Sequence, residues 1–96
     1  MELKIYYPVT LPDHMKEGVI NYLEKGIKPG GFLFAMLKND LFSAVAKADS
    51  NNSKLFKHWI IFIYNQFPMD SFGSEEKVIK WMKERQKNNY SVDMKY

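Results

Sequence analysis

The sequence predicts an all-α protein, a small bundle of four to five short helices that forms a single domain over residues 1–96. The first indication is that apolar residues recur every three or four positions in several segments. The second is that residues typical of helix ends, among them Gly26, Pro29 and Ser74, separate these segments. The third is the length of 96 residues, which is enough for one domain but not for two.

The two ends of the chain follow a different pattern. Residues 2–9 and 90–96 alternate apolar and polar side chains, which is the spacing of a short strand. The two segments are therefore candidates for a minor terminal β-ribbon. The alternative, which we favour, is a partly ordered N-terminus, an ordered core over about residues 11–86 and a mobile tail, residues 87–96.

The first helix is expected to begin near Pro12, with Asp13 in its first turn at the positive end of the helix dipole. Gly26 suits a left-handed C-terminal cap, and Pro29 prevents the helix from continuing. Its predicted buried stripe consists of residues spaced by four: Met15, Val19, Leu23 and Ile27.

A second helical stretch follows the turn at residues 29–31 and extends to Asp49. Asn39 and Asp40 interrupt it, and their side chains can cap a new helix at that point. The expected apolar face continues across this break through Leu33, Leu37, Leu41, Ala44, Val45 and Ala48.

The remaining chain predicts two more helices. Residues 50–53 are expected to form a loop in which Ser53 caps a helix over residues 54–66. That helix is apolar on most sides, which suggests that it faces the core on one side and a sister subunit on the other. After a connection over residues 67–73, Ser74 caps the last helix. The inward-facing residues expected on these two helices are Leu55, Trp59, Phe62, Ile63, Val78, Trp81, Met82 and Arg85.

The aromatic content is high for so short a chain, with seven Phe, six Tyr and two Trp. Each such side chain has roughly 150–250 Å² to bury, and one small core cannot hold them all. We therefore expect some rings at a subunit interface or in a ligand pocket, and a homo-oligomer, either a dimer or a tetramer.

Composition also bounds the compartment and the partners. The chain has no cysteine, the first seven residues hold two charges, and the longest apolar stretch, residues 59–64, is too short to span a bilayer. These features predict a cytoplasmic protein without a membrane anchor. The net charge of +3 favours anionic partners, but the absence of a basic run or a known motif argues against a nucleic-acid polymer.

Groups that catalyse reactions are scarce, so we do not expect an enzyme. His14 and His58 belong to different predicted helices, and neither has a partner at metal-ligand spacing. No phosphate-binding glycine loop and no nucleophile motif occurs, and the sequence indicates neither a cofactor nor a metal.

Binding features are better represented, although each has a structural alternative. Lys28 and Gly30 stand at a turn before a helix, where a phosphate could bind, or they form only a tight interhelical turn. The Tyr64–Asn65 pair and Trp81 with Arg85 combine flat rings with polar groups, as base recognition requires. The alternative for these rings is packing in the core or at an interface.

A series of short motifs resembles a widespread family of roughly hundred-residue proteins of tailed phages. The match covers about Leu11 to Lys83, and its most specific block runs from residue 29 to residue 41. The matching residues are Gly26, Ile27, Pro29, Gly30, Gly31, Phe32, Leu33, Ala35, Leu37, Asn39, Asp40, Leu41, Ala48, Asp49, Asn52, Tyr64, Asn65, Pro68, Gly73, Ser74 and Trp81. Phe72 departs from the family pattern, which usually has Trp there.

The resemblance implies a phage immune-evasion protein of the anti-CBASS type, acting in the cytoplasm of an infected bacterial host. Such a sponge binds cyclic dinucleotide signals, for example 3′3′-cGAMP, and sequesters them without cleavage. The alternative is a host-takeover protein that inhibits a bacterial enzyme by direct contact. The candidate ligand-binding residues are Tyr7, Lys28, Gly30, Asn39, Tyr64, Asn65, Trp81 and Arg85.

Overall fold

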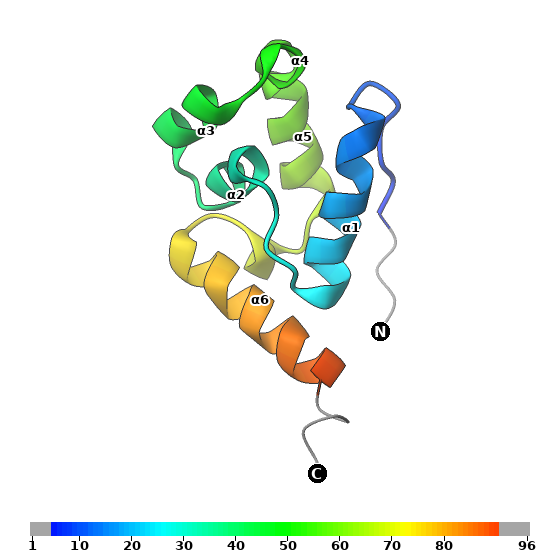
Figure 1. The fold of residues 1–96 in the computed structure, drawn as a ribbon, viewed down its shortest axis with the longest axis vertical. Coiled ribbons are helices and arrows are strands. Elements are labelled where there is room, and N and C mark those ends of the chain that lie inside the picture. Colours follow the sequence, from blue (N-terminus) through cyan, green and yellow to red (C-terminus); the bar gives the residue numbers. More distant parts are fainter. Residues whose placement is uncertain (1–4, 91–96) are drawn as a thin grey trace.

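The computed structural model describes residues 5–90 of the chain, with side chains through residue 87. It contains two 3₁₀ turns, η1 (Asp13–Met15) and η2 (Met69–Ser71), and the helices α1 (Lys16–Lys25), α2 (Gly31–Leu37), α3 (Leu41–Lys47), α4 (Ser50–Lys54), α5 (Phe56–Gln66) and α6 (Glu75–Tyr90). In Figure 1, α5 lies between α1 and α3, and α6 crosses below them.

The all-α prediction is confirmed. Helices dominate, and no strand occurs within residues 5–90. Residues 5–9, the described part of the N-terminal segment expected in the ribbon, therefore do not form a strand. Residues 1–4 and 91–96 lie outside the described residues. The six α-helices exceed the expected four to five because the segment between residues 31 and 54 forms three short helices instead of one or two. None of the described helices is both long and apolar enough to cross a membrane.

The first helix ends where the sequence predicts. Gly26 has a φ of 70°, and its N–H donates to the carbonyl oxygen of Tyr22, as a left-handed C-terminal cap requires. Val19 and Leu23 are buried as expected. Ile27 is exposed, contrary to the prediction, because it follows the cap and so no longer continues the helical stripe.

The predicted interruption between residues 37 and 41 is also present. Asn39 adopts a left-handed conformation (φ 65°), and the Asp40 carboxylate accepts a hydrogen bond from the backbone N–H of Ser43 at 3.3 Å, which caps α3. The prediction that one apolar face continues across the break is wrong. Leu41 and Val45 are exposed, because α3 leaves the axis of α2 at this turn.

Residues 50–53 are helical rather than the expected loop, and Ser53 does not cap the next helix. The Asp49 carboxylate caps α4 by accepting from the N–H of Asn52 at 2.7 Å. The side-chain oxygen of Asn52 in turn accepts from the indole N–H of the buried Trp59 at 2.8 Å. The cap and this hydrogen bond between α4 and α5 together help to hold a short polar segment as a helix.

The last helix packs against α1. Ser74 caps α6 by accepting from the N–H of Lys77 at 3.2 Å, as predicted. The buried indole of Trp81 donates to the carbonyl oxygen of Tyr22 at 3.2 Å, and the Gln86 side chain donates to that of Gly26 at 2.8 Å. The core lies between these helices and α2 and α5, and its largest members are Tyr22, Phe32, Trp59, Phe62, Phe67 and Trp81.

Candidate functional site

A largely apolar pocket of about 290 Å³ opens between α2, α3, α5 and the connection that precedes α6. Asp40 is the one charged residue among the described residues that line it. The lining consists of Met36, Asn39, Asp40, Leu41, Ala44, Phe56, Ile60, Ile63, Tyr64, Phe72 and Gly73.

The turn between α2 and α3 forms one wall of this pocket. The N–H of Asn39 donates to the carbonyl oxygen of Met36 at 3.1 Å, and that of Asp40 donates to Ala35 at 2.9 Å. The last carbonyl of α2, that of Leu37, accepts from the N–H of Gly73 at 2.8 Å. This bond fixes the connection before α6 against the end of α2, so residues distant in sequence face the same space.

Polar groups are few but concentrated at the start of α3. Hydrogen bonds from the side chain and the backbone N–H of Ser43 hold the pKa of the Asp40 carboxyl below its usual value, and the nearby charges of Lys38 and Lys47 lower it further. Asp40 is therefore ionised at neutral pH. Neither lysine belongs to the pocket lining: the ammonium of Lys38 lies over the ring of Phe34, and the side chain of Lys47 lies beside Gly31.

Only two of the predicted site residues line the pocket. Asn39 lies at the turn, and Tyr64 projects from α5 with 74% of its surface exposed. Asn65 follows Tyr64 on the same helix and is exposed, but it does not belong to the lining.

The structure places Tyr7 against the core and outside the pocket lining. Its hydroxyl donates to the carbonyl oxygen of Pro12 at 2.5 Å, and its ring meets those of Trp59 and Phe62 edge-on. Burial, followed by the charge of Asp13, raises the pKa of Tyr7 to about 12. The segment that carries it runs beside α1, on the opposite side of the molecule from α3 (Figure 1).

Trp81 and Arg85 are brought together, but as a structural pair. Trp81 is buried, and the Arg85 guanidinium stacks 3.7 Å above its ring centre. The indole N–H is already bonded to the backbone of α1. This pair therefore closes the α1–α6 contact and presents no free ring face for a base.

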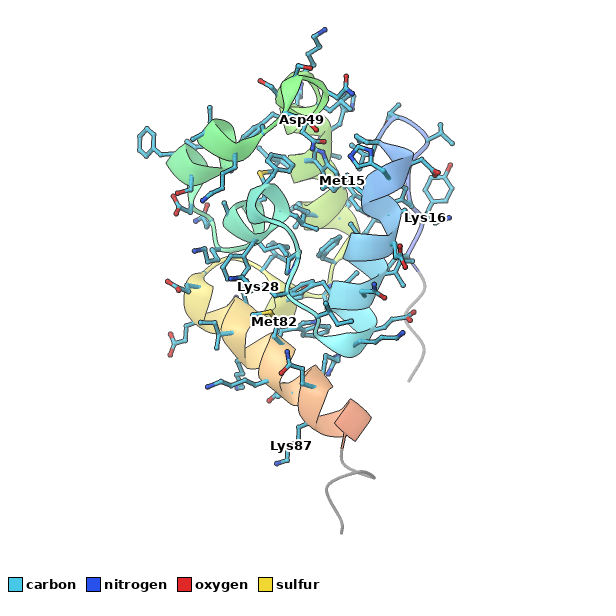
Figure 2. The ribbon with its side chains drawn as sticks, viewed as in Figure 1. Met15, Lys16, Lys28, Asp49, Met82 and Lys87 are labelled. Carbon is cyan, nitrogen blue, oxygen red and sulfur yellow. The ribbon has the colours of Figure 1, made fainter. Side chains whose placement is uncertain are left out.

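Lys28 and Gly30 remain at the surface. The ammonium of Lys28 lies 4.7 Å from the ring centre of Phe34, and that of Lys38 lies 4.5 Å from the same ring. Figure 2 shows Lys28 beside α2, between that helix and α6. Gly30 precedes α2 as its N-terminal cap, and no side chain approaches it.

Most of the pocket lining was missed from the sequence, notably Leu41, Ile60 and Phe72. The predicted break at residues 39–40 was the signal from which the pocket could have been predicted. Where a helix breaks between two apolar segments, the apolar side chains on either side of the break no longer pack along one continuous helix face, and a hollow can remain between them. The described residues contain no group of His, Cys, Asp or Glu side chains that could hold a metal ion.

Comparison of the chain with protein-family models, with curated proteins and with solved structures found no match.

Proposed function

We propose that this protein acts by binding, without catalysis, and that its pocket receives one base of a cyclic dinucleotide such as 3′3′-cGAMP. The observation that carries the proposal is convergence in space. Three segments that carry the phage-family resemblance contribute to a single pocket. The first and second of these segments are more than twenty residues apart in the sequence. These motif residues are Asn39, Asp40, Leu41, Tyr64 and Gly73, together with Phe72 at the departing position.

The size and the lining of the pocket suit one flat ring. An apolar cavity of about 150 Å³ already holds benzene, so 290 Å³ has room for a heterocyclic base. The rings of Phe56, Tyr64 and Phe72 offer faces on which a base can stack. The volume is too small for two bases and two phosphates, so the rest of the ligand must remain at the opening.

Positive charge for that remainder would come from two lysines that lie outside the pocket lining. Lys38 and Lys47 lie near enough to Asp40 to lower its pKa, and together the three groups carry one net positive charge. A phosphodiester at this edge would be attracted to the lysines, whereas Asn39 and Asp40 could bond to the polar edge of a base. In the infected host cell such binding would remove the signal from solution.

The test is calorimetric titration against a panel of cyclic di- and trinucleotides, followed by chromatography of the ligand released by heat. We expect binding of at least one cyclic dinucleotide and its recovery without chemical change. Tyr64→Ala should weaken binding about ten-fold, since stacking on one aromatic ring contributes ~1–3 kcal/mol. Met69→Ala is the matched control, because Met69 is exposed but lies outside the pocket. The absence of heat with every member of the panel would rule the proposal out.

One observation favours the alternative, a host-takeover protein that inhibits a bacterial enzyme by contact. Phe42 is 86% exposed next to the pocket, and Leu41 and Val45 on the same helix are also exposed. Such an apolar patch is typical of protein-binding surfaces. Affinity purification from host extract should then recover one protein with the native chain and lose it with Phe42→Ser. Recovery of the same proteins by both forms would contradict this alternative.

A further inference from the structure

An apolar face covers one side of the molecule around the pocket opening. It consists of Leu41, Val45, Ile60 and Tyr64, with Phe42 beside them, and is called here the α3–α5 face. Leu41, Ile60 and Tyr64 line the pocket itself. Val45 is one helical turn from Leu41 and three residues from Phe42, so the five side chains form one continuous surface.

The apolar area of this face is more than half of what a stable interface buries on one partner. Aromatic side chains have roughly 150–250 Å² of surface and aliphatic ones somewhat less, so the exposed fractions of these five leave on the order of 500 Å² of apolar surface. The largest patch on a typical monomer is about 300–600 Å². A standard interface buries about 800 Å² on each partner, and the flanking polar residues can supply the rest.

The shape of the face suits a second copy of the same face. It combines a hollow, the pocket, which Leu41 helps to line, with the exposed ring of Phe42 at the next position of α3. A two-fold axis between hollow and ring places the ring of each copy opposite the hollow of the other, so the surface is complementary to itself. A phenyl ring fits the volume, since benzene occupies an apolar cavity of about half this size.

We propose that a second copy of this chain covers the α3–α5 face, and that Phe42 of each copy occupies the pocket of the other. The pair then buries two exposed aromatic rings per chain, Phe42 and Tyr64, in one contact. Asp40 remains at the polar edge of that contact, where its carboxylate is already bonded to Ser43.

Self-pairing also regulates the pocket, a consequence that rests on the proposed function. A base and the partner's Phe42 ring would compete for one space, so ligand binding would separate the two copies. Removal of the ring should then raise the apparent affinity for the dinucleotide, because no displacement is needed.

The test is sedimentation equilibrium of the full chain, without ligand, over a wide range of concentrations. We expect the mass of two chains for the native protein, and at least a ten-fold rise in the dimer dissociation constant for Phe42→Ser. Met69→Ser is the matched control, because Met69 is 78% exposed but stands on η2, outside the α3–α5 face. Far-ultraviolet circular dichroism should be unchanged in both, since each side chain is exposed in the single chain. Ile60→Glu, which places a charge at the pocket rim, should also separate the copies.

A native protein with the mass of one chain at every concentration would overturn the pairing, and so would a Phe42→Ser dimer as tight as the native one. These outcomes do not depend on the nucleotide. If the copies pair but no cyclic nucleotide binds, the proposed function is wrong and the pairing is supported. If a cyclic nucleotide binds without dissociating the pair, the competition is wrong while the proposed function stands.

Discussion

The hydrogen bond between Trp59 and Asn52 permits the sharpest test of how the core is specified. Trp59 is 0% exposed and Asn52 is 3% exposed, so neither polar group can turn to water. The indole N–H donates to the Asn52 side-chain oxygen at 2.8 Å. Replacing Asn52 by Leu keeps a side chain of similar size but leaves that N–H without an acceptor.

The cost follows from this geometry. A buried donor that loses its partner destabilises a protein by about 1–3 kcal/mol, and we expect about 2 kcal/mol for Asn52→Leu. In a domain of this size, 1 kcal/mol shifts the Tm by roughly 4–8 °C, so the melting temperature should fall by about 10 °C. Asn51→Leu is the matched control on the same helix, because Asn51 is exposed, and its effect should stay within about 0.5 kcal/mol.

The assay is urea unfolding followed by far-ultraviolet circular dichroism, which does not depend on the fluorescence of Trp59. Trp59→Phe removes the donor at the expense of some packing. If the unpaired N–H causes the loss of stability in Asn52→Leu, the two substitutions should not be additive. The double variant Asn52→Leu/Trp59→Phe should lose less free energy of unfolding than the two single variants lose in sum, by at least about 1 kcal/mol. Strict additivity, or equal effects of Asn51→Leu and Asn52→Leu, would refute this reasoning.

Two further predictions concern the backbone and the pH dependence. Gly26→Ala should destabilise the protein by at least about 3 kcal/mol in urea unfolding, because φ is +70° and the new Cβ would lie 2.5 Å from the carbonyl oxygen of Met82. Gly18→Ala should instead stabilise it by about 0.5–1 kcal/mol, because the new Cβ would have no atom within 4 Å beyond the backbone of its own helix. Burial raises the pKa of Tyr7 to about 12. The contribution of the neutral Tyr7 hydroxyl to the free energy of unfolding is therefore complete below pH 10 and is lost as the pH rises towards 12. Since Tyr7 is partly exposed, we discount this loss to roughly 1 kcal/mol. Urea midpoints between pH 8 and pH 11.5 should fall less steeply for Tyr7→Phe, with a remaining slope from Tyr22, whose pKa burial also raises.

Helix ends were predictable because their causes are local. The glycine at position 26, the capping carboxylate of Asp40 and the hydroxyl of Ser74 each act within four residues of their own position. The short helix α4 was not predictable. Its polar sequence is typical of a loop, and it is held as a helix partly by the bond that the Trp59 indole N–H, seven residues away and in another helix, donates to Asn52.

Only part of the candidate site was predicted, because the position of an aromatic ring also depends on contacts between segments distant in sequence. Tyr7, Trp81 and Arg85 have the residue types that bind bases, but the same ring with a polar handle also suits a core position near backbone carbonyls. Sequence alone does not show which backbone carbonyl lies within hydrogen-bond distance of the Tyr7 hydroxyl or the Trp81 indole N–H. Tyr64 differs because its helix already buries Trp59, Phe62 and Ile63 on the opposite side, which leaves its ring in solvent.

The pocket and the exposed face have one common origin in the turn at Asn39. An uninterrupted helix through residues 31–47 would have aligned Leu41 and Val45 with the buried Leu33 and Leu37, and no hollow would remain. The left-handed conformation of Asn39 redirects α3, which opens the pocket beside Ala44 and exposes the residues that the apolar pattern assigns to the core. Because a left-handed conformation is rare for residues with a side chain other than Asn and Asp, this position explains why an apolar segment carries a polar pair at its centre.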